Sequence, residues 1–143
     1  MRFISRMVMG DGTLPYDVRE QLEGEGILFL EEGLSGSIRY SRFRAPGRRF
    51  NNRVTAERMG LGISAERIAL YCHSGSAKLI DNPFSADAFS YVDVDVEHDG
   101  RLVFTVDYDR AGEPGHSGQV RIHVLTPNAE AIAEMVRPRI SRG

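Results

Sequence analysis

Arginines are the residues of this 143-residue chain whose type and spacing point most clearly to chemistry. Residues 39–58 contain seven arginines, a single acid, Glu57, and no lysine. The planar guanidinium fork matches the oxygen geometry of phosphate and carboxylate better than the point charge of lysine does. The pattern predicts an anion-binding site made of Arg39, Arg42, Arg44, Arg48, Arg49 and Arg53. The alternative is a row of solvated strand residues that protects a sheet edge from aggregation.

An acidic segment follows later in the chain, where residues 81–109 contain eight acids against Arg101 alone. Along a strand, Asp93, Asp95 and Glu97 would lie about 7 Å apart, which is too dispersed for a tight metal cage. An EF-hand loop starting at Asp93 fails because His98 occupies the position that requires glycine. A weak calcium contact by these acids remains an alternative interpretation. We expect the acidic face and the arginine-rich segment to complement each other, within the fold or between subunits. The acidic face consists of Asp93, Asp95, Glu97 and Asp99.

Catalytic candidates are few. Residues 115–119, Gly-His-Ser-Gly-Gln, place a serine after Gly-His but lack the closing glycine of a nucleophile elbow. The four histidines show no pair at helical zinc-ligand spacing; they are His73, His98, His116 and His123. The sequence contains no phosphate-binding P-loop, no GxGxxG and no CxxC. We therefore expect no catalytic residues, no metal site, no cofactor and no enzymatic activity. A nucleophilic site formed by His73, His116 and a loop serine is the rival interpretation.

Composition sets the class of protein and its expected setting. The chain is 41% apolar and 27% charged, which is typical of one globular domain. The single cysteine, Cys72, excludes an intramolecular disulfide and a Cys-rich zinc site, and it indicates a reducing cytosol. Arg6 interrupts the N-terminal apolar run, and no window is long enough to span a bilayer. We expect a cytoplasmic protein, with peripheral attachment as its only membrane role.

Charge also ranks the expected partners. With a formal net charge of -2 the whole molecule does not attract nucleic acid, although Tyr40, Phe43 and Phe50 interleave the arginines and could stack single-stranded bases. We therefore rank nucleic acid last. A protein partner or self-association ranks first, and an anionic lipid or phosphate follows.

Hydrophobic periodicity predicts a mostly β chain. We expect a lead-in helix over 15–23, a β-region over 27–126 and a C-terminal helix over 127–140. These elements form one domain spanning 1–143, in which residues 1–12 are expected to be flexible. Within the β-region, residues 33–36 are predicted to turn a first hairpin, and residues 45–53 to form a loop or an irregular edge between strands. Alternating valines predict a second hairpin around Asp99 and Gly100. The fold class is α+β, mostly β: a bent antiparallel sandwich or partly open barrel of about seven strands, capped by the C-terminal helix.

The segments LEGEGILFLEEGLSGSIRY and GLGISAERIALYC, together with the terminal helix, resemble uncharacterised bacterial pleckstrin-homology-like and GRAM-like domains over residues 22–140. The resemblance implies contacts with lipids, peptides or other subunits. Lipid-binding members hold phosphates with basic residues at the end of the first strand and on the second. Arg42 and Arg44 look like the second-strand half, whereas Glu31 and Glu32 occupy the first-strand position.

From these patterns we expect a non-enzymatic binding or scaffolding module that recognises an anionic partner through its arginines. The alternative is a homo-oligomeric assembly protein in which the arginine-rich edge docks on the acidic hairpin of a neighbouring subunit, residues 93–99.

Overall fold

The computed structural model describes residues 12–73 and 77–140 of the chain. The stretch predicted to be flexible, 1–12, lies outside the described residues except for Gly12. The elements in chain order are α2 (Tyr16–Glu25), β1 (Ile27–Ala45), β2 (Arg48–Phe50), β3 (Arg53–Ser64), β4 (Arg67–Cys72), β5 (Ala77–Pro83), the 3₁₀ turn η2 (Asp87–Tyr91), β6 (Val92–Val96), β7 (Arg101–Asp107), α3 (Tyr108–Ala111), β8 (Ser117–Leu125) and α4 (Ala129–Ile140).

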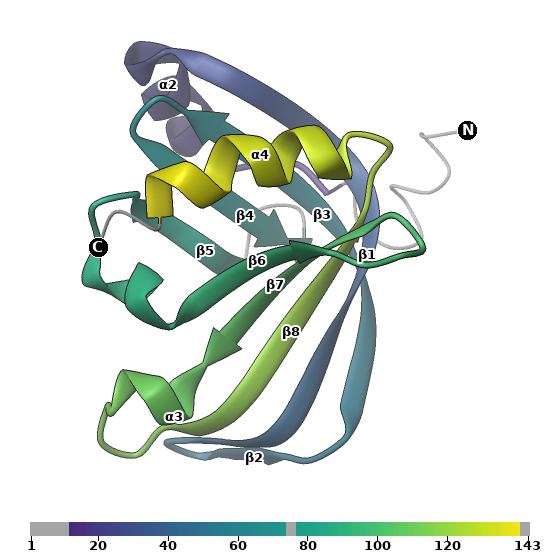
Figure 1. Ribbon diagram of the computed structural model, residues 1–143, viewed down its shortest axis with the longest axis vertical. Helices are drawn as coiled ribbons and strands as arrows, with labels where there is room; N and C mark the ends of the chain where they lie inside the picture. The colour runs from purple at the N-terminus through teal and green to yellow at the C-terminus, as the bar shows by residue number, and fades with distance from the viewer. Residues whose placement is uncertain (1–11, 74–76, 141–143) are drawn as a thin grey trace. The chain divides into compact units, whose positions relative to one another are not determined.

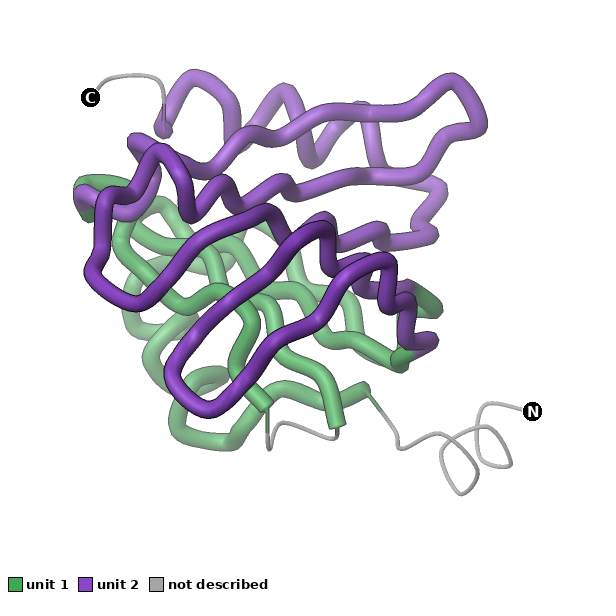
Figure 2. Tube along the Cα trace, turned by 90° about the horizontal axis from the view of Figure 1, so that it is seen from below, with its two compact units in different colours: residues 1–36, 57–86 green, residues 37–56, 87–143 purple. Residues whose placement is uncertain are grey.

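The predicted class is confirmed: the described chain is mostly β and antiparallel, with a short N-terminal helix and a C-terminal helix (Figure 1). Hydrogen-bonded neighbours follow the order β5-β4-β3-β1-β8-β7-β6, and β2 pairs with β1. The chain divides into two compact units, residues 1–36 with 57–86 and residues 37–56 with 87–143 (Figure 2). The single-domain boundary of 1–143 stays a prediction.

The first unit is built on the hairpin of β3 and β4. Its register pairs Met59 with Cys72 and Ile63 with Ile68, so the apolar residues of both strands meet on one buried face. Helix α2 packs on the opposite face of the hairpin, where Val18 and Leu22, four residues apart on one helical stripe, form a cluster with Ala69 and Tyr71. A Cβ on Gly62 would lie 2.5 Å from the side chain of Leu22, so this glycine makes room for the helix.

A polar network lies beside that core in the same unit. The Arg67 guanidinium pairs with Asp81 at 2.7 Å and with Glu25 at 3.3 Å, and the Tyr71 hydroxyl donates to Asp81 at 2.5 Å. Burial, together with the hydrogen bond to Asp81, raises the pKa of Tyr71 well above its usual value. These contacts join the end of α2 to β4 and β5.

The second unit contains the hairpin of β6 and β7, and its alternation agrees with the prediction. Val94 pairs with Phe104, and Phe104 pairs in turn with Ile122 of β8. Helix α4 contacts β6 and β7 through one buried stripe, Ala129, Ile132, Ala133 and Val136. The helix starts two residues later than predicted, after Thr126, whose hydroxyl accepts the N–H of Asn128 at 3.1 Å.

One sequence prediction is wrong in the region of β1. Residues 33–36 do not turn a hairpin, because β1 continues through them as a strand of 19 residues; Gly33 adopts φ 76° within it. Residues 45–53, predicted as a loop or irregular edge, contain a two-residue turn at Pro46 and Gly47 and the short strand β2, which pairs with β1. Glycines and serines permit a chain reversal, but here pairing along the whole strand decides its course.

The continuity of β1 also corrects the carry-over from lipid-binding domains. Glu31 and Glu32 lie on the same strand as Arg42 and Arg44, so the two pairs are not on a first and a second strand. The assignment of Arg42 and Arg44 to the second strand is therefore wrong. Any anion-binding role has to rest on the structure around these arginines.

Candidate anion-binding site

The six arginines predicted to bind an anion lie on β1, β2 and the first residue of β3, on both sides of the β1–β2 turn. We call residues 39–53 the arginine hairpin. Its register pairs Ala45 with Arg48, Arg44 with Arg49 and Phe43 with Phe50. Because successive side chains of a strand point to opposite faces, Phe43 and Phe50 share one face, and Arg44 and Arg49 share the other. The turn itself needs glycine, since residue 47 has φ 76°.

An aromatic cluster supports the hairpin from its inner face. The rings of Phe43 and Phe50 stack with centroids 6.1 Å apart, and Tyr40 lies 5.1 Å from Phe50. Tyr108, at the start of α3, lies 5.6 Å from Phe43, and burial raises the pKa of its hydroxyl. Packing of this kind fixes the hairpin, so its arginines project from a defined support.

Six of the seven arginines extend from this support into solvent: Arg39, Arg42, Arg44, Arg48, Arg49 and Arg53 are all exposed. The ion pairs found among the described residues use other arginines, such as Arg67, Arg110 and Arg137, and none of these six. Arg53 lies 4.5 Å over the ring of Phe50 as a cation–π contact. The hairpin thus carries six positive charges without a carboxylate partner in the described part of the chain.

The seventh arginine has a different role. Arg58 belongs to the first unit, is half-buried and donates from Nη1 to the carbonyl of Gly33 at 3.0 Å. Its Nε is buried and has no partner among the described atoms. Arg58 therefore supports β1 and is not part of the arginine hairpin.

The backbone of the hairpin deviates from regular strand geometry at Arg42. This residue adopts the left-handed φ of 50°, and its N–H donates to the Asn51 side chain at 3.1 Å. Gly118 of β8 approaches the same place so closely that a Cβ on it would lie 2.2 Å from the Arg42 carbonyl oxygen. A non-glycine residue in this φ region is uncommon and costs free energy unless its surroundings fix it. The Asn51 bond and the close contact with Gly118 supply that fixation.

The acidic face is also formed, but its charges are already engaged within its own unit. Asp93 pairs with Arg110 at 3.0 Å, and Asp95 pairs with Arg137 at 2.8 Å. Asp99 and Glu97 both contact Arg101, at 2.7 and 3.3 Å, and the Arg101 backbone and guanidinium hold the pKa of Asp99 below its usual range. These partners are not the arginines of residues 39–53, so the contact between the acidic and arginine-rich faces stays a prediction.

Glu97 also meets His123 of β8, whose Nε2 lies 3.4 Å from the carboxylate. Burial lowers the pKa of His123 and outweighs the opposite effect of Glu97, so the ring is neutral at pH 7. The Nδ1 atom of this ring is buried and has no partner among the described atoms. His123 is thus a core histidine of the second unit.

An open depression of about 620 Å³ lies beside the β6–β7 turn, lined in part by Glu97, His98, Asp99 and Glu130. None of the hairpin arginines lines it. Glu97 is already engaged by Arg101, Arg121 and His123. Ser117, which the sequence offered as a nucleophile, is the first residue of β8, so it also lacks the strand-to-helix turn of a nucleophile elbow.

Sequence patterns missed one group of side chains. His73 lies beside Glu57 and Cys72 in the first unit, although 15 positions separate Glu57 from Cys72. Burial raises the pKa of the Cys72 thiol to about 11, with a further contribution from Glu57. The only sequence signal was the β3–β4 hairpin itself, whose register brings Glu57 near Cys72.

No protein-family model matches the chain, and no curated protein matches it either. Among the described helices, none has the length and apolar character that crossing a bilayer requires. The chemistry of the arginine hairpin is therefore the main guide to function.

Proposed function

We propose that this protein is a non-enzymatic binding module whose arginine hairpin binds an anionic partner through a phosphate group. The observation that carries the proposal is the direct pairing of Arg44 with Arg49 across the hairpin. Like charges in directly opposite positions destabilise a sheet. An oxyanion bound between them turns that repulsion into attraction.

The geometry suits an oxyanion. Directly opposite side chains start from Cβ atoms about 5 Å apart, so both guanidinium groups can reach one phosphate. Arg48, the neighbour of Arg49 on β2, adds a third positive charge to the hairpin from the opposite face of the strand. Guanidinium groups form short, charge-assisted hydrogen bonds with phosphate, which are about twice as strong as neutral ones.

A pleckstrin-homology-like fold is the finer structural assignment that we propose. It is supported by the antiparallel strand order and by the C-terminal helix that packs on β6 and β7. Folds of this type host lipid, peptide and subunit contacts, so the fold alone does not select a ligand. Phosphate is favoured here by the arginines and not by the fold.

Co-sedimentation with vesicles tests the proposal. The full chain is mixed with two kinds of phosphatidylcholine vesicle. One contains no anionic lipid, and in the other about one fifth of the lipid is a phosphoinositide with a phosphorylated headgroup. We expect binding to the anionic vesicles only, and the double variant Arg44→Gln/Arg49→Gln should lose at least about tenfold in affinity, because each charge-assisted bond contributes about 1.5–3 kcal/mol. Titration with a phosphopeptide in a second arm distinguishes a protein partner from a membrane.

Arg110→Gln is the matched control. It removes one positive charge from the same unit, but from an arginine that already pairs with Asp93. It should change binding less than about threefold, since surface ion pairs contribute little. An equal loss of binding free energy per removed charge in the control and in the double variant would reduce the effect to net charge and overturn the proposal. Absence of binding to vesicles, phosphopeptide and inorganic phosphate would overturn it as well.

The assembly alternative receives less support. A neighbouring arginine edge would have to displace Arg110, Arg137 and Arg101 from the acids of residues 93–99. Light scattering at low and high ionic strength tests this alternative, since an oligomer held by that contact should dissociate as salt screens it.

A further inference from the structure

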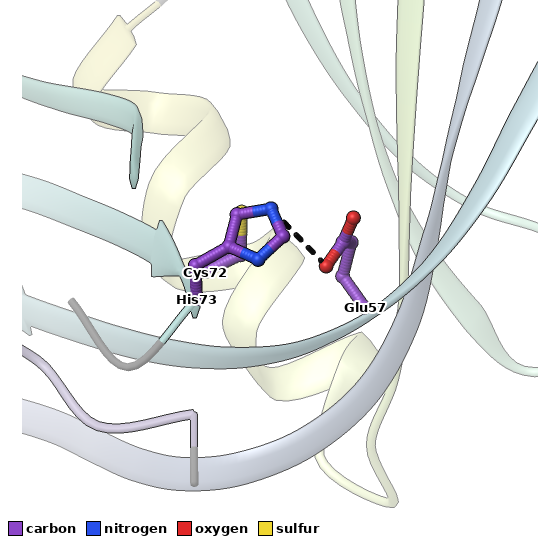
Figure 3. Close-up of side chains that lie close together, drawn as sticks. All are labelled: Glu57, Cys72 and His73. Atoms are coloured by element: carbon purple, nitrogen blue, oxygen red, sulfur yellow. Dashed lines mark ion pairs between the residues drawn. The ribbon is translucent and has the colours of Figure 1, made fainter. Parts of the chain in front are cut away.

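Three side chains with metal-ligating atoms converge at the end of β4 in the first unit, outside the arginine hairpin. One ligand atom from each of Glu57, Cys72 and His73 lies within 4.8 Å of the other two (Figure 3). The His73 Nε2 lies 3.4 Å from the Glu57 carboxylate. The three residues offer an oxygen, a sulfur and a nitrogen ligand.

The hairpin register explains how Glu57 and Cys72 meet. Met59 pairs directly with Cys72, so Glu57, two residues before Met59, is a diagonal neighbour of Cys72 on the same face. Cys72 is buried there with 1% of its surface exposed. The Glu57 side chain is 13% exposed, so the carboxylate too lies largely out of solvent.

Backbone geometry brings in the third residue. In a continuing strand, His73 would point to the face opposite Cys72. Instead the strand ends at Cys72, and His73 adopts a left-handed φ of 53°. This conformation is uncommon for a residue other than glycine, and such residues concentrate at ligand-binding and active sites. Here it places the imidazole next to Glu57 (Figure 3).

Ligand type and spacing fit zinc. Zinc binds cysteine sulfur, histidine nitrogen and carboxylate oxygen at about 2.0–2.3 Å, so neighbouring ligands of a tetrahedral ion lie about 3.3–3.8 Å apart. The His73–Glu57 separation of 3.4 Å already has this value, and the two spacings to the Cys72 sulfur need to shorten by about 1.3 Å at most. The two negative ligands, a thiolate and a carboxylate, balance the charge of one divalent cation.

We propose that Glu57, Cys72 and His73 form a zinc site with three protein ligands and a fourth position open to solvent. The site is independent of the proposed anion binding by the arginine hairpin. Three protein ligands with one open position resemble catalytic rather than structural zinc sites. The side chain of His73 is 55% exposed, so an ion can enter from solvent.

The competing explanation is that the imidazole and the carboxylate form an ion pair and nothing more. An ion pair requires no sulfur, whereas zinc coordination does. A probe that reports sulfur ligation therefore separates the two explanations.

The experiment uses the full chain without an affinity tag, kept reduced with a phosphine. Zinc is titrated in competition with a colorimetric chelator, and cobalt(II) is titrated separately to record the absorption spectrum. We expect one equivalent of zinc with micromolar or tighter affinity, and a thiolate-to-cobalt charge-transfer band in the near ultraviolet. Cys72→Ser should abolish the band.

Two further variants keep the test decisive if replacing the buried Cys72 impairs folding. His73→Asn retains a residue that tolerates the left-handed conformation, and Glu57→Gln keeps the shape of that side chain. Each should weaken zinc binding at least about tenfold through the loss of one ligand. His98→Asn, an exposed histidine of the other unit, is the matched control and should bind zinc as the unmodified chain does.

The proposal is overturned if the chain binds less than a fifth of an equivalent of zinc, if the cobalt spectrum lacks the thiolate band, or if His73→Asn binds zinc as tightly as the control. Failure of vesicle binding leaves this site unaffected, and loss of zinc binding leaves the arginine hairpin unaffected. The two proposals are therefore tested separately.

Discussion

Reversing one charge of the Arg44–Arg49 pair should stabilise the protein while it weakens anion binding. The two arginines are directly opposite across the β1–β2 hairpin, and neither has an ion-pair partner within residues 12–73 and 77–140. A cross-strand charge pair contributes about 0.2–1 kcal/mol, with the sign set by the charges. Arg49→Glu removes the repulsion and adds an attraction, so we expect a gain of about 0.5–2 kcal/mol in the free energy of unfolding.

Urea denaturation at low ionic strength measures this gain, and a double-mutant cycle isolates its source. Arg44→Glu alone should also stabilise, whereas Arg44→Glu/Arg49→Glu restores two like charges and should return near the starting stability. The control is Arg48→Glu, because Arg48 is paired with the uncharged Ala45. At about 1 M salt, where the screening length is about 3 Å, the differences should largely disappear.

If Arg49→Glu changes stability no more than Arg48→Glu does, the two arginines do not repel each other across the hairpin. The anion-binding role is refuted if Arg49→Glu stabilises the chain and leaves vesicle, phosphopeptide and phosphate binding intact. That result would identify the arginines as a solvated edge. Stability and binding have to change in opposite directions for the proposal to hold.

Three further predictions concern the structure that supports these sites. Asp81→Ala should lower the free energy of unfolding by about 2–4 kcal/mol in chemical denaturation, because it leaves the largely buried Arg67 and the Tyr71 hydroxyl without their partner. A loss below about 1 kcal/mol would contradict this expectation. The pKa of His123 is lowered in the folded protein, so the unfolded chain binds the proton more readily and the free energy of unfolding should fall as the pH drops below about 6.5. In thermal melts recorded over a series of pH values, His123→Gln should flatten this dependence. An unchanged slope would show that another group is responsible. Gly118→Ala should cost about 1–3 kcal/mol in thermal denaturation, because residue 118 has φ 88° and its Cβ would overlap the neighbouring backbone; an unchanged melting temperature would refute that close approach.

Local patterns predicted the elements whose apolar residues recur at one clear period. The alternation of Val92, Val94 and Val96 fixed both the β6–β7 hairpin and its register, because a shift by one residue would expose every valine. The stripe from Ala129 to Val136 likewise predicted the face of α4 that is buried. These signals are local, so one sequence is sufficient to read them.

The course of β1 could not be predicted in the same way. Gly33 and Gly36 allow a turn as readily as a strand, and only pairing with distant strands decides between the two. The same limit applied to Glu57 and Cys72. Their approach depends on the register of β3 with β4, and that of His73 depends on one left-handed backbone residue.

The sequence by itself determined the class of the fold, the concentration of arginines in residues 39–53 and the acidic character of residues 93–99. Tertiary structure decided which of those charges are engaged. It paired the four acids with arginines of their own unit and placed Arg44 opposite Arg49. Composition fixes how many charges a segment carries, but only the register of strands sets the distances over which those charges act.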